Sequence, residues 1–527
     1  MRKIPRRIKF PEPFLASRAF PARFKFQQSA GFAAANIGNR GGPTSAMYGL
    51  SVSLQSVLAG VLVMLALLSV QLAALGVIRL FLPQPRVRVP ALPDKALPRV
   101  LVQLPVCDEG AFAVRVAAAA AKLDWPRDRL EIQLLDDGRA DNHDALVSAV
   151  RAQIPDGVSF SILRRGTRDG FKAGNLAFGL LQSDAPYVAI FDADFVPPRD
   201  FLRRTVPALV SDPGLSFVQA RWAHANRNRN WLTSAQGLLL DSHFAVEQEA
   251  RVRAGLPISF NGSAGVWRRL AIDNGGGWTG DTLTEDLDLS IRCALKGWRA
   301  ALLSDVEVPG ELPETAAAWR AQQARWTKGH AQVARKLIPE IWRSNLPLWK
   351  KAVVTTQICQ FAFYALAAAS AAISLMLMAM GVVYLRSVAE LGLSVTALGL
   401  LCSTSYLYLG QKFLSREREP LLGRSLLLAL VFPSGLILSN TRATFEAFFS
   451  SRMVFVRTPK AGSLHVPGGW RGGPELVAGL LLPVFAFTEQ AWSAPFFVFA
   501  VAGLVSIGAM GFSGSGAVPA RDVIRRE

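Results

Sequence analysis

Asp192 and Asp194 are the first residues whose types and spacing could carry out chemistry. They flank Ala193 directly after the apolar run 187–191, so both carboxylates are expected at the end of a buried strand. Mg²⁺ and Mn²⁺ prefer oxygen ligands, and proteins often hold them with one or two carboxylates together with phosphate oxygens. The pair therefore predicts a divalent cation bound with a diphosphate group. The alternative interpretation is two solvated loop acids.

Thr284, Glu285 and Asp286 form a second group, inside the acidic segment 281–288. Apolar residues follow at helical spacing, so a helix is expected to begin here. A threonine can cap such a helix, and acids in its first turn complement the helix dipole. A carboxylate fixed at a helix start beside a sugar site can also take a proton from an acceptor hydroxyl, which is general-base catalysis. Both interpretations can hold together.

Gln322, Arg325 and Trp326 form a third group on a predicted helix over residues 314–337. Positions three apart share a helix face, so Gln322 and Arg325 are expected to point the same way. An arginine can bind a departing diphosphate with two parallel hydrogen bonds. The tryptophan ring offers an apolar face to a sugar, although a lone tryptophan on a helix is also a common core residue.

The elements that must position these groups alternate between strands and helices. Apolar runs predict strands at 100–106, 130–135, 158–163, 187–191 and 215–218, and helical patterns lie at 110–123 and 142–154. This alternation indicates an α/β domain with a mostly parallel sheet and helices on both faces. Ligands in such folds bind beyond the carboxyl ends of the strands, where acidic pairs occur here at 108–109, 136–137 and 192–194.

Long apolar segments surround this domain. No charge occurs from residue 48 to residue 78 or from 353 to 384, and a membrane-crossing helix needs about 20 apolar residues. Further apolar runs lie at 391–409, 426–438, 476–487 and 494–510. The sequence therefore predicts a first transmembrane helix at 47–83, an enzyme-sized domain at 90–345, transmembrane and interfacial helices at 350–450, two transmembrane helices at 475–512 and a tail at 513–527.

The net charge of +19 does not indicate nucleic-acid binding. Many of the lysines and arginines lie in loops beside apolar segments, where the positive-inside rule places them on the cytosolic face, and no nucleic-acid motif accompanies them. The four cysteines have no metal-ligand spacing and are expected to be reduced. Residues 1–46 contain Glu12 as the only acid and are interpreted as a disordered basic arm, an organelle transit peptide, or a segment before a true start at Met47.

The three groups, in this order, resemble the pattern of family 2 glycosyltransferases of the cellulose synthase type, especially cellulose synthase-like mannan and glucomannan synthases. The family has an Asp after an early strand, then D-x-D, T-E-D and Q-x-x-R-W; the matching residues are Asp137, Asp192 with Asp194, Thr284-Glu285-Asp286, and Gln322 with Arg325 and Trp326. Segments 170–174 and 260–265 extend the resemblance, which covers residues 98–340 and continues into the apolar segments. It implies a GT-A-like nucleotide-sugar transferase domain joined to a multi-pass α-helical transmembrane region.

The resemblance also implies donor-binding roles. Asp137 and Asp192 would hold the nucleotide base and ribose, with Lys172 near the nucleotide. Asp194 would bind Mg²⁺ or Mn²⁺ on the diphosphate, and Arg325 would contact the same diphosphate.

For the acceptor, the resemblance implies that the T-E-D residues Thr284, Glu285 and Asp286 are catalytic, with Asp286 as the base. Gln322 and Trp326 would line the acceptor end of the glycan. A cation and an arginine that stabilise the leaving diphosphate, with one base opposite them, give a single displacement with inversion.

A last match lies at residues 455–462, where Phe455, Thr458 and Lys460 resemble the F-x-V-T-x-K gating loop of cellulose synthases. Here Arg457 replaces a valine and Pro459 stiffens the loop. The alternative is a basic juxtamembrane loop that contacts lipid head groups. The preceding residues 440–453 are interpreted as an interfacial amphipathic helix.

This loop and the catalytic domain must both be cytosolic, so an even number of crossings is expected between Arg343 and Phe455. Three apolar runs lie there. Either the run 426–438, interrupted by Pro433, is re-entrant, or residues 353–384 fold as two passes.

The favoured hypothesis is a processive inverting β-glycosyltransferase that polymerises hexose and moves the product across the membrane. The expected partners are a nucleotide-sugar donor, a growing β-glycan and the lipid bilayer, and export partner proteins are consistent with this hypothesis. The expected location is the plasma (inner) membrane. The donor is UDP-glucose or GDP-mannose. The alternatives are a single-addition lipid glycosyltransferase, such as a ceramide glucosyltransferase, and a catalytically inactive membrane scaffold.

Overall fold

A computed structural model describes residues 45–85, 87–382, 384–414, 422–450, 472–488 and 495–513. Contacts divide the chain into residues 1–52 and 53–527. Of the first unit the structure describes only the beginning of helix α1, and all other elements belong to the second. The predicted basic arm at 1–46, apart from its last two residues, and the gating-loop match at 455–462 lie outside the described residues.

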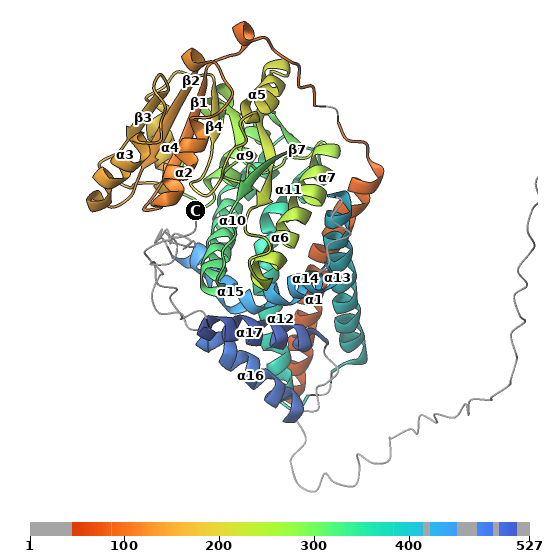
Figure 1. Ribbon diagram of the computed structural model, residues 1–527. Coiled ribbons are helices and arrows are strands. Elements are labelled where there is room, and N and C mark those ends of the chain that lie inside the picture. The colour runs from red at the N-terminus through yellow and green to blue at the C-terminus, as the bar shows by residue number, and fades with distance from the viewer. Residues whose placement is uncertain are drawn as a thin grey trace, which may run out of the picture. The chain divides into compact units, whose positions relative to one another are not determined.

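A seven-stranded sheet forms the centre of the α/β region (Figure 1). The strands are β1 (Val100–Val106), β2 (Leu130–Asp136), β3 (Ser159–Leu163), β4 (Tyr187–Ile190), β5 (Leu215–His224), β6 (Gly265–Arg268) and β7 (Arg299–Gly310). Their order in the sheet is β3-β2-β1-β4-β6-β5-β7, and only the pairs made by β6 are antiparallel. The mostly parallel sheet that the sequence predicts is confirmed, with one reversed strand inside it.

The apolar runs of the sequence do not predict two of the strands, β6 and β7. β6 has four residues and ends in an arginine, so it shows no apolar run, while β7 alternates buried and exposed positions over part of its length. β5 extends six residues beyond the predicted run 215–218, because its second half pairs with β7 through a register shift between Ala220 and Arg221.

The helices of the α/β region join and cover the strands. They are α2 (Ala111–Ala120), α3 (His143–Arg151), α4 (Phe171–Leu180), α5 (Phe201–Ser211), α6 (Trp231–Ser242), the π-helical turn η4 (His243–Gln248), α7 (Glu249–Arg253), α8 (Arg269–Asn274), α9 (Glu285–Leu295) and α10 (Ala316–Arg343), with short 3-10 turns η1 (Asp94–Ala96), η2 (Arg127–Arg129) and η3 (Ala140–Asn142). The predicted helices at 110–123, 142–154 and 314–337 therefore exist, and the last continues six residues further.

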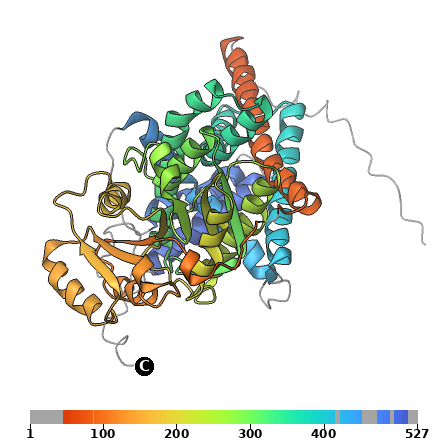
Figure 2. The same ribbon diagram turned by 90° about the horizontal axis from the view of Figure 1, so that it is seen from above.

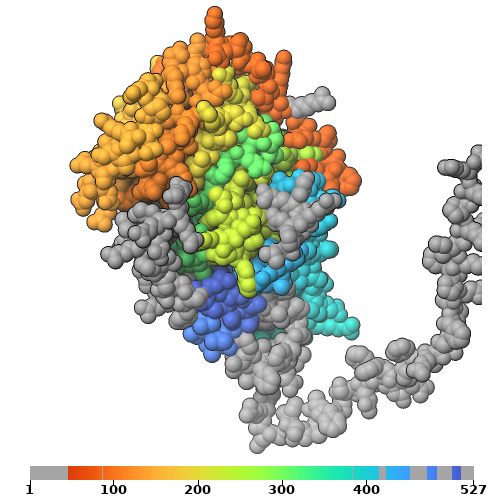
Figure 3. Space-filling model, in the orientation of Figure 1, coloured from red at the N-terminus to blue at the C-terminus, as the bar shows by residue number. Residues whose placement is uncertain are grey.

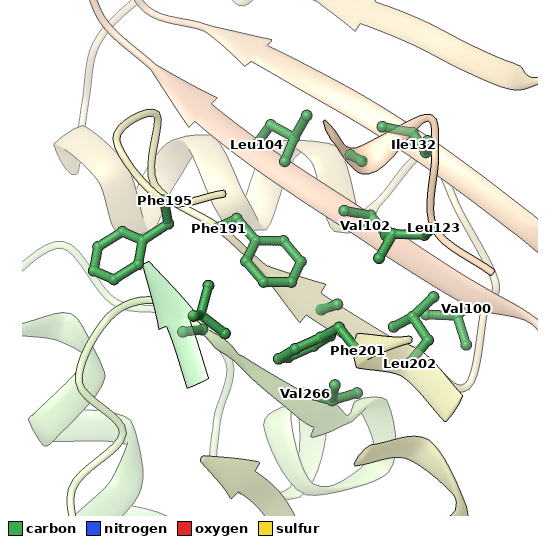
Figure 4. Close-up of a cluster of buried hydrophobic side chains, with 14 of the residues drawn as sticks. Val100, Val102, Leu104, Leu123, Ile132, Phe191, Phe195, Phe201, Leu202 and Val266 are labelled. Atoms are coloured by element: carbon green, nitrogen blue, oxygen red, sulfur yellow. The ribbon is translucent and has the colours of Figure 1, made fainter. Parts of the chain in front are cut away.

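Every residue of β1 is buried, as expected for a strand covered on both faces. Val100, Val102 and Leu104 belong to the core on one face, whereas Leu101 belongs to the core on the other. Figure 4 shows the first core, where Phe191 meets Phe201 with ring centroids 4.8 Å apart in an edge-to-face arrangement. Since Phe191 directly precedes Asp192, this packing fixes the end of the strand that carries the acidic pair.

Long apolar helices follow and precede the sheet. They are α1 (Ser45–Phe81), α11 (Leu348–Ile358), η5 (Cys359–Phe361), α12 (Ala362–Ala379), α13 (Arg386–Phe413), α14 (Leu422–Val431), η6 (Phe432–Leu436), α15 (Ile437–Phe449), α16 (Gly473–Thr488) and α17 (Pro495–Ser513). Within the described residues, four helical stretches are long and apolar enough to cross a membrane: Ala46–Phe81, Leu348–Ala379, Arg386–Phe413 and Gly423–Phe449.

Helix α1 lies beside α13 in both views (Figures 1 and 2). Leu62 of α1 and Val388 and Val395 of α13 belong to one buried cluster. A buried hydrogen-bond group joins α13 to the α/β region, because Gln411 receives a hydrogen bond from Arg227, 3.1 Å away, and Arg227 also pairs with the fully buried Asp241 of α6. The apolar helices and the sheet domain are therefore packed together within this unit of the chain.

The segment from α14 to α15 contacts the α/β region at both of its ends. Ser425 of α14 shares a hydrogen bond of 2.8 Å with Ser234 of α6, and Glu446 of α15 lies 3.4 Å from Lys328 of α10. Between these contacts the helix is interrupted by η6, which contains Pro433. A proline removes a backbone donor and disrupts the helical ladder at this point.

Candidate active site

The end of β2 carries two acids that are held by different arginines. Asp136 accepts hydrogen bonds from Arg164 at 2.9 Å and from the backbone N–H of Gly138 at 2.8 Å, and it lies 2.7 Å from His143. Asp137 receives two hydrogen bonds from Arg165, at 2.8 and 2.6 Å. A bidentate arginine fixes a carboxylate in orientation as well as in charge.

Arg164 and Arg165 were not singled out from the sequence. They directly follow β3, which neighbours β2 in the sheet, so the rule that ligands bind beyond the strand ends could have found them. The structure brings Asp137 into this cluster. Its nucleotide-binding role stays a prediction.

Lys172, at the start of α4, connects Asp192, which follows β4, to helix α9, which carries Glu285 and Asp286. Its ammonium nitrogen lies 2.6 Å from Asp192 Oδ1 and 3.8 Å from Glu285 Oε1, and it donates to the carbonyl of Gly262 at 2.8 Å. Burial alone would lower the pKa of Lys172, but Asp192 and Glu285 raise it to about 12. The lysine therefore stays protonated between the strand-end acid Asp192 and the helix-start acid Glu285.

Lys172 and its partner Glu285 come from distant parts of the sequence. In Figure 3 the orange surface formed by β1 to α4 borders the yellow and green surface of the later elements. The ion pairs of Lys172 cross between them, because Asp192 follows β4 while Glu285 begins α9.

Asp194 is buried, with 5 % of its surface exposed, so it is unlike a solvated loop acid. Arg115 donates to its backbone carbonyl at 3.4 Å. Among the residues that the structure describes, no three His, Cys, Asp or Glu side chains gather as a closed metal site. The metal-binding role of Asp194 stays a prediction.

Thr284 occupies the position before α9, but its side chain makes no capping hydrogen bond. The capping interpretation is therefore wrong for the side chain, although Glu285 and Asp286 do lie in the first helical turn. The reason is packing: a Cβ on Gly329 of α10 would lie only 2.5 Å from the Thr284 methyl group. The glycine lets the start of α9 approach α10 closely, which brings the T-E-D residues beside the helix of Trp326.

Asp286 is partly buried and lies next to Glu285 in the same helical turn. Burial, and then the charge of Glu285, raise the pKa of Asp286 to about 7. The carboxylate accepts a hydrogen bond from the backbone N–H of Leu287 at 2.8 Å, which partly offsets this effect. A carboxylate with a pKa near neutrality is suited to accept a proton during a reaction.

Arg325 of α10 lies close to the same acids. Burial lowers its pKa, while the charges of Glu285, Asp192, Asp286 and Asp194 act in the opposite direction. The arginine therefore provides positive charge beside both the strand-end and the helix-start carboxylates, and its diphosphate-binding role stays a prediction.

Gln322 and Trp326 lie on the same helix and are partly buried, whereas Trp319, two turns before Trp326, is a core residue with 3 % exposed surface. The core-tryptophan interpretation therefore fits Trp319 and not Trp326. The acceptor-binding roles of Gln322 and Trp326 stay predictions.

The loop 260–264 fills the space between Lys172 and Asp286. Gly262 has a φ of +81°, and a Cβ there would lie 2.9 Å from Asp286 Oδ2. Glycine alone combines this backbone conformation with so close an approach. Ser263 continues the loop, and its hydroxyl accepts a hydrogen bond from the backbone N–H of Asp192 at 3.0 Å.

Comparison with known proteins adds independent information. Residues 187–409 match the profile of Glycosyl transferase family group 2. The chain is 41 % identical over 295 residues to glucomannan 4-beta-mannosyltransferase 1 of Oryza sativa subsp. japonica, covering 53 % of this chain and 56 % of that protein. It is 42 % identical over 259 residues to glucomannan 4-beta-mannosyltransferase 7 of Arabidopsis thaliana, covering 48 % of this chain and 47 % of that protein.

The chain thus spans about half the length of the curated relatives it matches. Among solved structures it is similar to the mannosyltransferase PcManGT from Pyrobaculum calidifontis in complex with GDP-Man and Mn²⁺, with 21 % identity and a TM-score of 0.48. That match covers 70 % of this chain and 99 % of the other.

Proposed function

We propose that this chain, which carries a glycosyltransferase family 2 domain of GT-A-like fold, is a membrane-embedded hexosyltransferase that builds a β-linked glycan from a nucleotide-sugar donor. The observation that carries the proposal is the meeting of Asp192, Lys172, Glu285 and Arg325 around Asp286 at the end of the sheet. The names of the curated relatives support mannose as a transferred sugar.

In the proposed reaction an acceptor hydroxyl oxygen forms a bond to the anomeric carbon of the donor sugar. The bond from that carbon to the diphosphate oxygen breaks, and the nucleoside diphosphate leaves with the bonding electrons. Asp286 takes the proton of the hydroxyl. Attack opposite the leaving group inverts the anomeric centre, so an α-linked donor gives a β-linked product.

Arg325 and Lys172 would stabilise the charge on the leaving diphosphate, because both cations lie beside the acids that border it. A divalent cation held by Asp194, with Asp192 nearby, would neutralise further phosphate charge when bound. Asp137, fixed by Arg165, would contact the nucleotide.

The membrane helices support a product path next to the acceptor site. Helix α10, which carries Gln322 and Trp326, leads directly into α11 and contacts α15 through Lys328 and Glu446. Because both ends of the α14–α15 segment contact the α/β region, we propose that this segment is re-entrant and that two crossings separate Arg343 from residue 455. The catalytic domain and the loop at 455–462 would then share the cytosolic side.

The donor is tested on the purified chain in nanodiscs with GDP-mannose and UDP-glucose, each with Mg²⁺ or Mn²⁺. We expect release of nucleoside diphosphate and a product that a linkage-specific β-mannanase digests. Release from UDP-glucose alone, with a product sensitive only to β-glucanase, would replace mannose by glucose. No release from any nucleotide sugar would contradict the proposed function.

Product length tests polymerisation. A glycan product that is held on the Trp326 ring is expected to be long even when donor is scarce. Trp326→Ala should shorten this product or abolish it. Trp342→Ala is the matched control, because Trp342 lies near the end of the same helix with 48 % of its surface exposed. A product that consists only of a monoglycosylated lipid would decide for single addition.

The cellular membrane is a separate question. Location in the plasma (inner) membrane and the presence of export partner proteins stay predictions, to be checked by membrane fractionation and by pull-down of the tagged chain. The gating role of Phe455, Thr458 and Lys460 also stays a prediction.

A further inference from the structure

The π-helical turn η4 interrupts the path from α6 to α7 and displays polar side chains inward. His243, Glu247 and Gln248 all lie in it, and Glu247 and Gln248 are buried. π-turns are rare and are found often at functional sites. Asp241 and Arg251 of the flanking helices are buried as well, so the turn lies among buried polar side chains.

Their partner is the loop beside Asp286. Gln248 donates to the side-chain oxygen of Asn261 at 3.1 Å and to the carbonyl of Ser259 at 2.8 Å. The side-chain nitrogen of Asn261 lies 3.2 Å from His243 Nε2, and His243 Nδ1 lies 3.0 Å from Glu247 Oε2. The π-turn therefore holds both ends of the Asn261 amide.

The direction of these hydrogen bonds follows from Glu247. Burial would raise its pKa, but Arg251 and His243 lower it to about 2, so the carboxylate is ionised and can only accept. His243 Nδ1 then donates to Glu247. Gln248 donates to the oxygen of the Asn261 amide, so the amide nitrogen faces His243 Nε2 and donates to it. The imidazole is held by one contact at each ring nitrogen, which fixes its orientation.

The network has a rigid base that reaches a membrane helix. Arg251 is fully buried and donates to Glu247 at 3.0 Å and to Gln357 of α11 at 2.9 Å. Gln357 in turn donates to the hydroxyl of Ser259 at 3.3 Å. The start of the loop beside Asp286, at Ser259 and Asn261, is thus anchored to η4 and to α11 at once.

On its other side the same loop borders the reacting groups. The carbonyl of Gly262 accepts from Lys172, and the α-carbon of Gly262 lies against Asp286. The backbone N–H of Phe260 donates to Ser290, whose hydroxyl donates to the carbonyl of Asp286 at 2.6 Å. A shift of the loop would therefore move the lysine and the base relative to each other.

We propose that His243 is a positioning residue that acts through Asn261 to fix loop 260–263, and so sets the place of Asp286 against Lys172 and the donor. This inference rests on the proposed function, because the effect is read in sugar transfer. It assigns the π-turn a role that none of the sequence motifs carries. Misplacement of reacting groups by about 1 Å can cost on the order of 10²-fold in rate, so a partly loosened loop should be visible in kcat.

Two substitutions separate positioning from general folding. In His243→Gln the side-chain amide reaches the place of Nε2 and can still accept from Asn261. In His243→Asn the amide reaches the place of Nδ1, so it keeps the hydrogen bond to Glu247 but loses the acceptor for Asn261. Both variants replace the imidazole ring by a side-chain amide, and they differ only in how far this amide reaches.

The experiment measures kcat, the donor KM and the Tm of the three proteins in nanodiscs. We expect His243→Asn to lower kcat about 10-fold with the donor KM within a factor of two, because the base is misplaced while donor contacts remain. His243→Gln should keep most of the wild-type kcat. Equal kcat for the two variants, or a loss that only follows the Tm, would overturn the proposal.

Asn261→Ala provides the second test, from the other end of the same hydrogen bond, and it also serves if His243→Asn does not fold. The single change should lower kcat to a similar extent, and in the His243→Asn background it should add little, because the link is already broken. Fully additive effects would overturn the proposal. If the wild-type chain itself transferred no sugar, the proposed function would fail, whereas an active wild type with an equally active His243→Asn would contradict this inference alone.

Discussion

Two pairs of adjacent acids, Asp136–Asp137 and Glu285–Asp286, have the same charges and opposite surroundings. Each acid of the first pair has its own arginine, at 2.9 Å for Asp136 and 2.6 Å for Asp137. In the second pair Glu285 shares Lys172 with Asp192, at 3.8 Å, and burial raises the pKa of both Glu285 and Asp286. The arginines fix the orientation of the first pair, whereas acids that burial makes costly to ionise can take up a proton.

The comparison depends most strongly on Asp286. Asp286→Asn preserves size but removes the proton acceptor, so kcat should fall about 10³-fold while the donor KM changes little. Turnover and nucleotide-binding titrations measure this. Asp281→Asn is the matched control, because Asp281 is exposed in the same acidic segment and paired with Lys336 at 2.9 Å. A variant that kept turnover at saturating donor but bound donor poorly would make Asp286 a binding residue.

The same substitution should affect stability in the opposite direction. A folded-state pKa raised to about 7 means that ionised Asp286 destabilises the fold, and that this cost grows as pH rises from the unfolded pKa through the folded one. The Tm gain of Asp286→Asn should therefore be larger at pH 8 than at pH 5. A gain that did not depend on pH would not come from ionisation.

Metal removal tests whether a cation neutralises the phosphate charge of the donor. Chelation by EDTA should abolish turnover, and Asp194→Asn should lower it about 10²-fold because phosphate charge is no longer neutralised. Mn²⁺ titration by electron paramagnetic resonance in the presence of nucleoside diphosphate gives a readout that does not depend on catalysis. Full activity in chelator would remove the cation from the proposed site.

The pH profile sharpens the comparison further. Because Asp286 must be ionised to act as a base and its pKa is about 7, kcat/KM should fall about tenfold per pH unit below that value. Initial rates between pH 5.5 and 8.5 measure this fall of kcat/KM on the acidic side of the profile. A profile that stayed flat down to pH 5.5 would exclude Asp286 as the group that limits the rate.

The first acidic pair gives the smallest expected effect. Arg165→Gln removes the bidentate partner of Asp137, so the donor KM should rise about tenfold while kcat at saturation stays near wild type. Arg164→Gln, next to it, is the comparison variant, since it releases Asp136 and leaves Asp137 paired. A fall in kcat without a change in KM would give both acidic pairs the same role.

Local patterns in the sequence predicted much of the scaffold. Apolar runs located five strands, although β5 continues six residues beyond its predicted end, and the uncharged segments lie in the helices α1 and α11–α12. β6 and β7 were missed because neither is a continuous apolar run, and their edges are fixed by neighbours in the sheet. Arg164 and Arg165 have no acid beside them in the sequence, so the acidic pairs that mark the other strand ends do not mark β3, although the arginines lie at a strand end like the acids that they hold.

The sequence by itself determined which residues lie at strand ends and helix starts, because period and chain order are local properties. Only the tertiary structure decided the partners: Lys172 of one half meets Glu285 of the other, and His243 reaches Asn261 through a π-turn that no sequence pattern marks. It also decided the pKa of Asp286, since burial sums over residues that are far apart in the chain. Residue type is written in the sequence, but the free energy of ionising a side chain depends on what the fold packs around it.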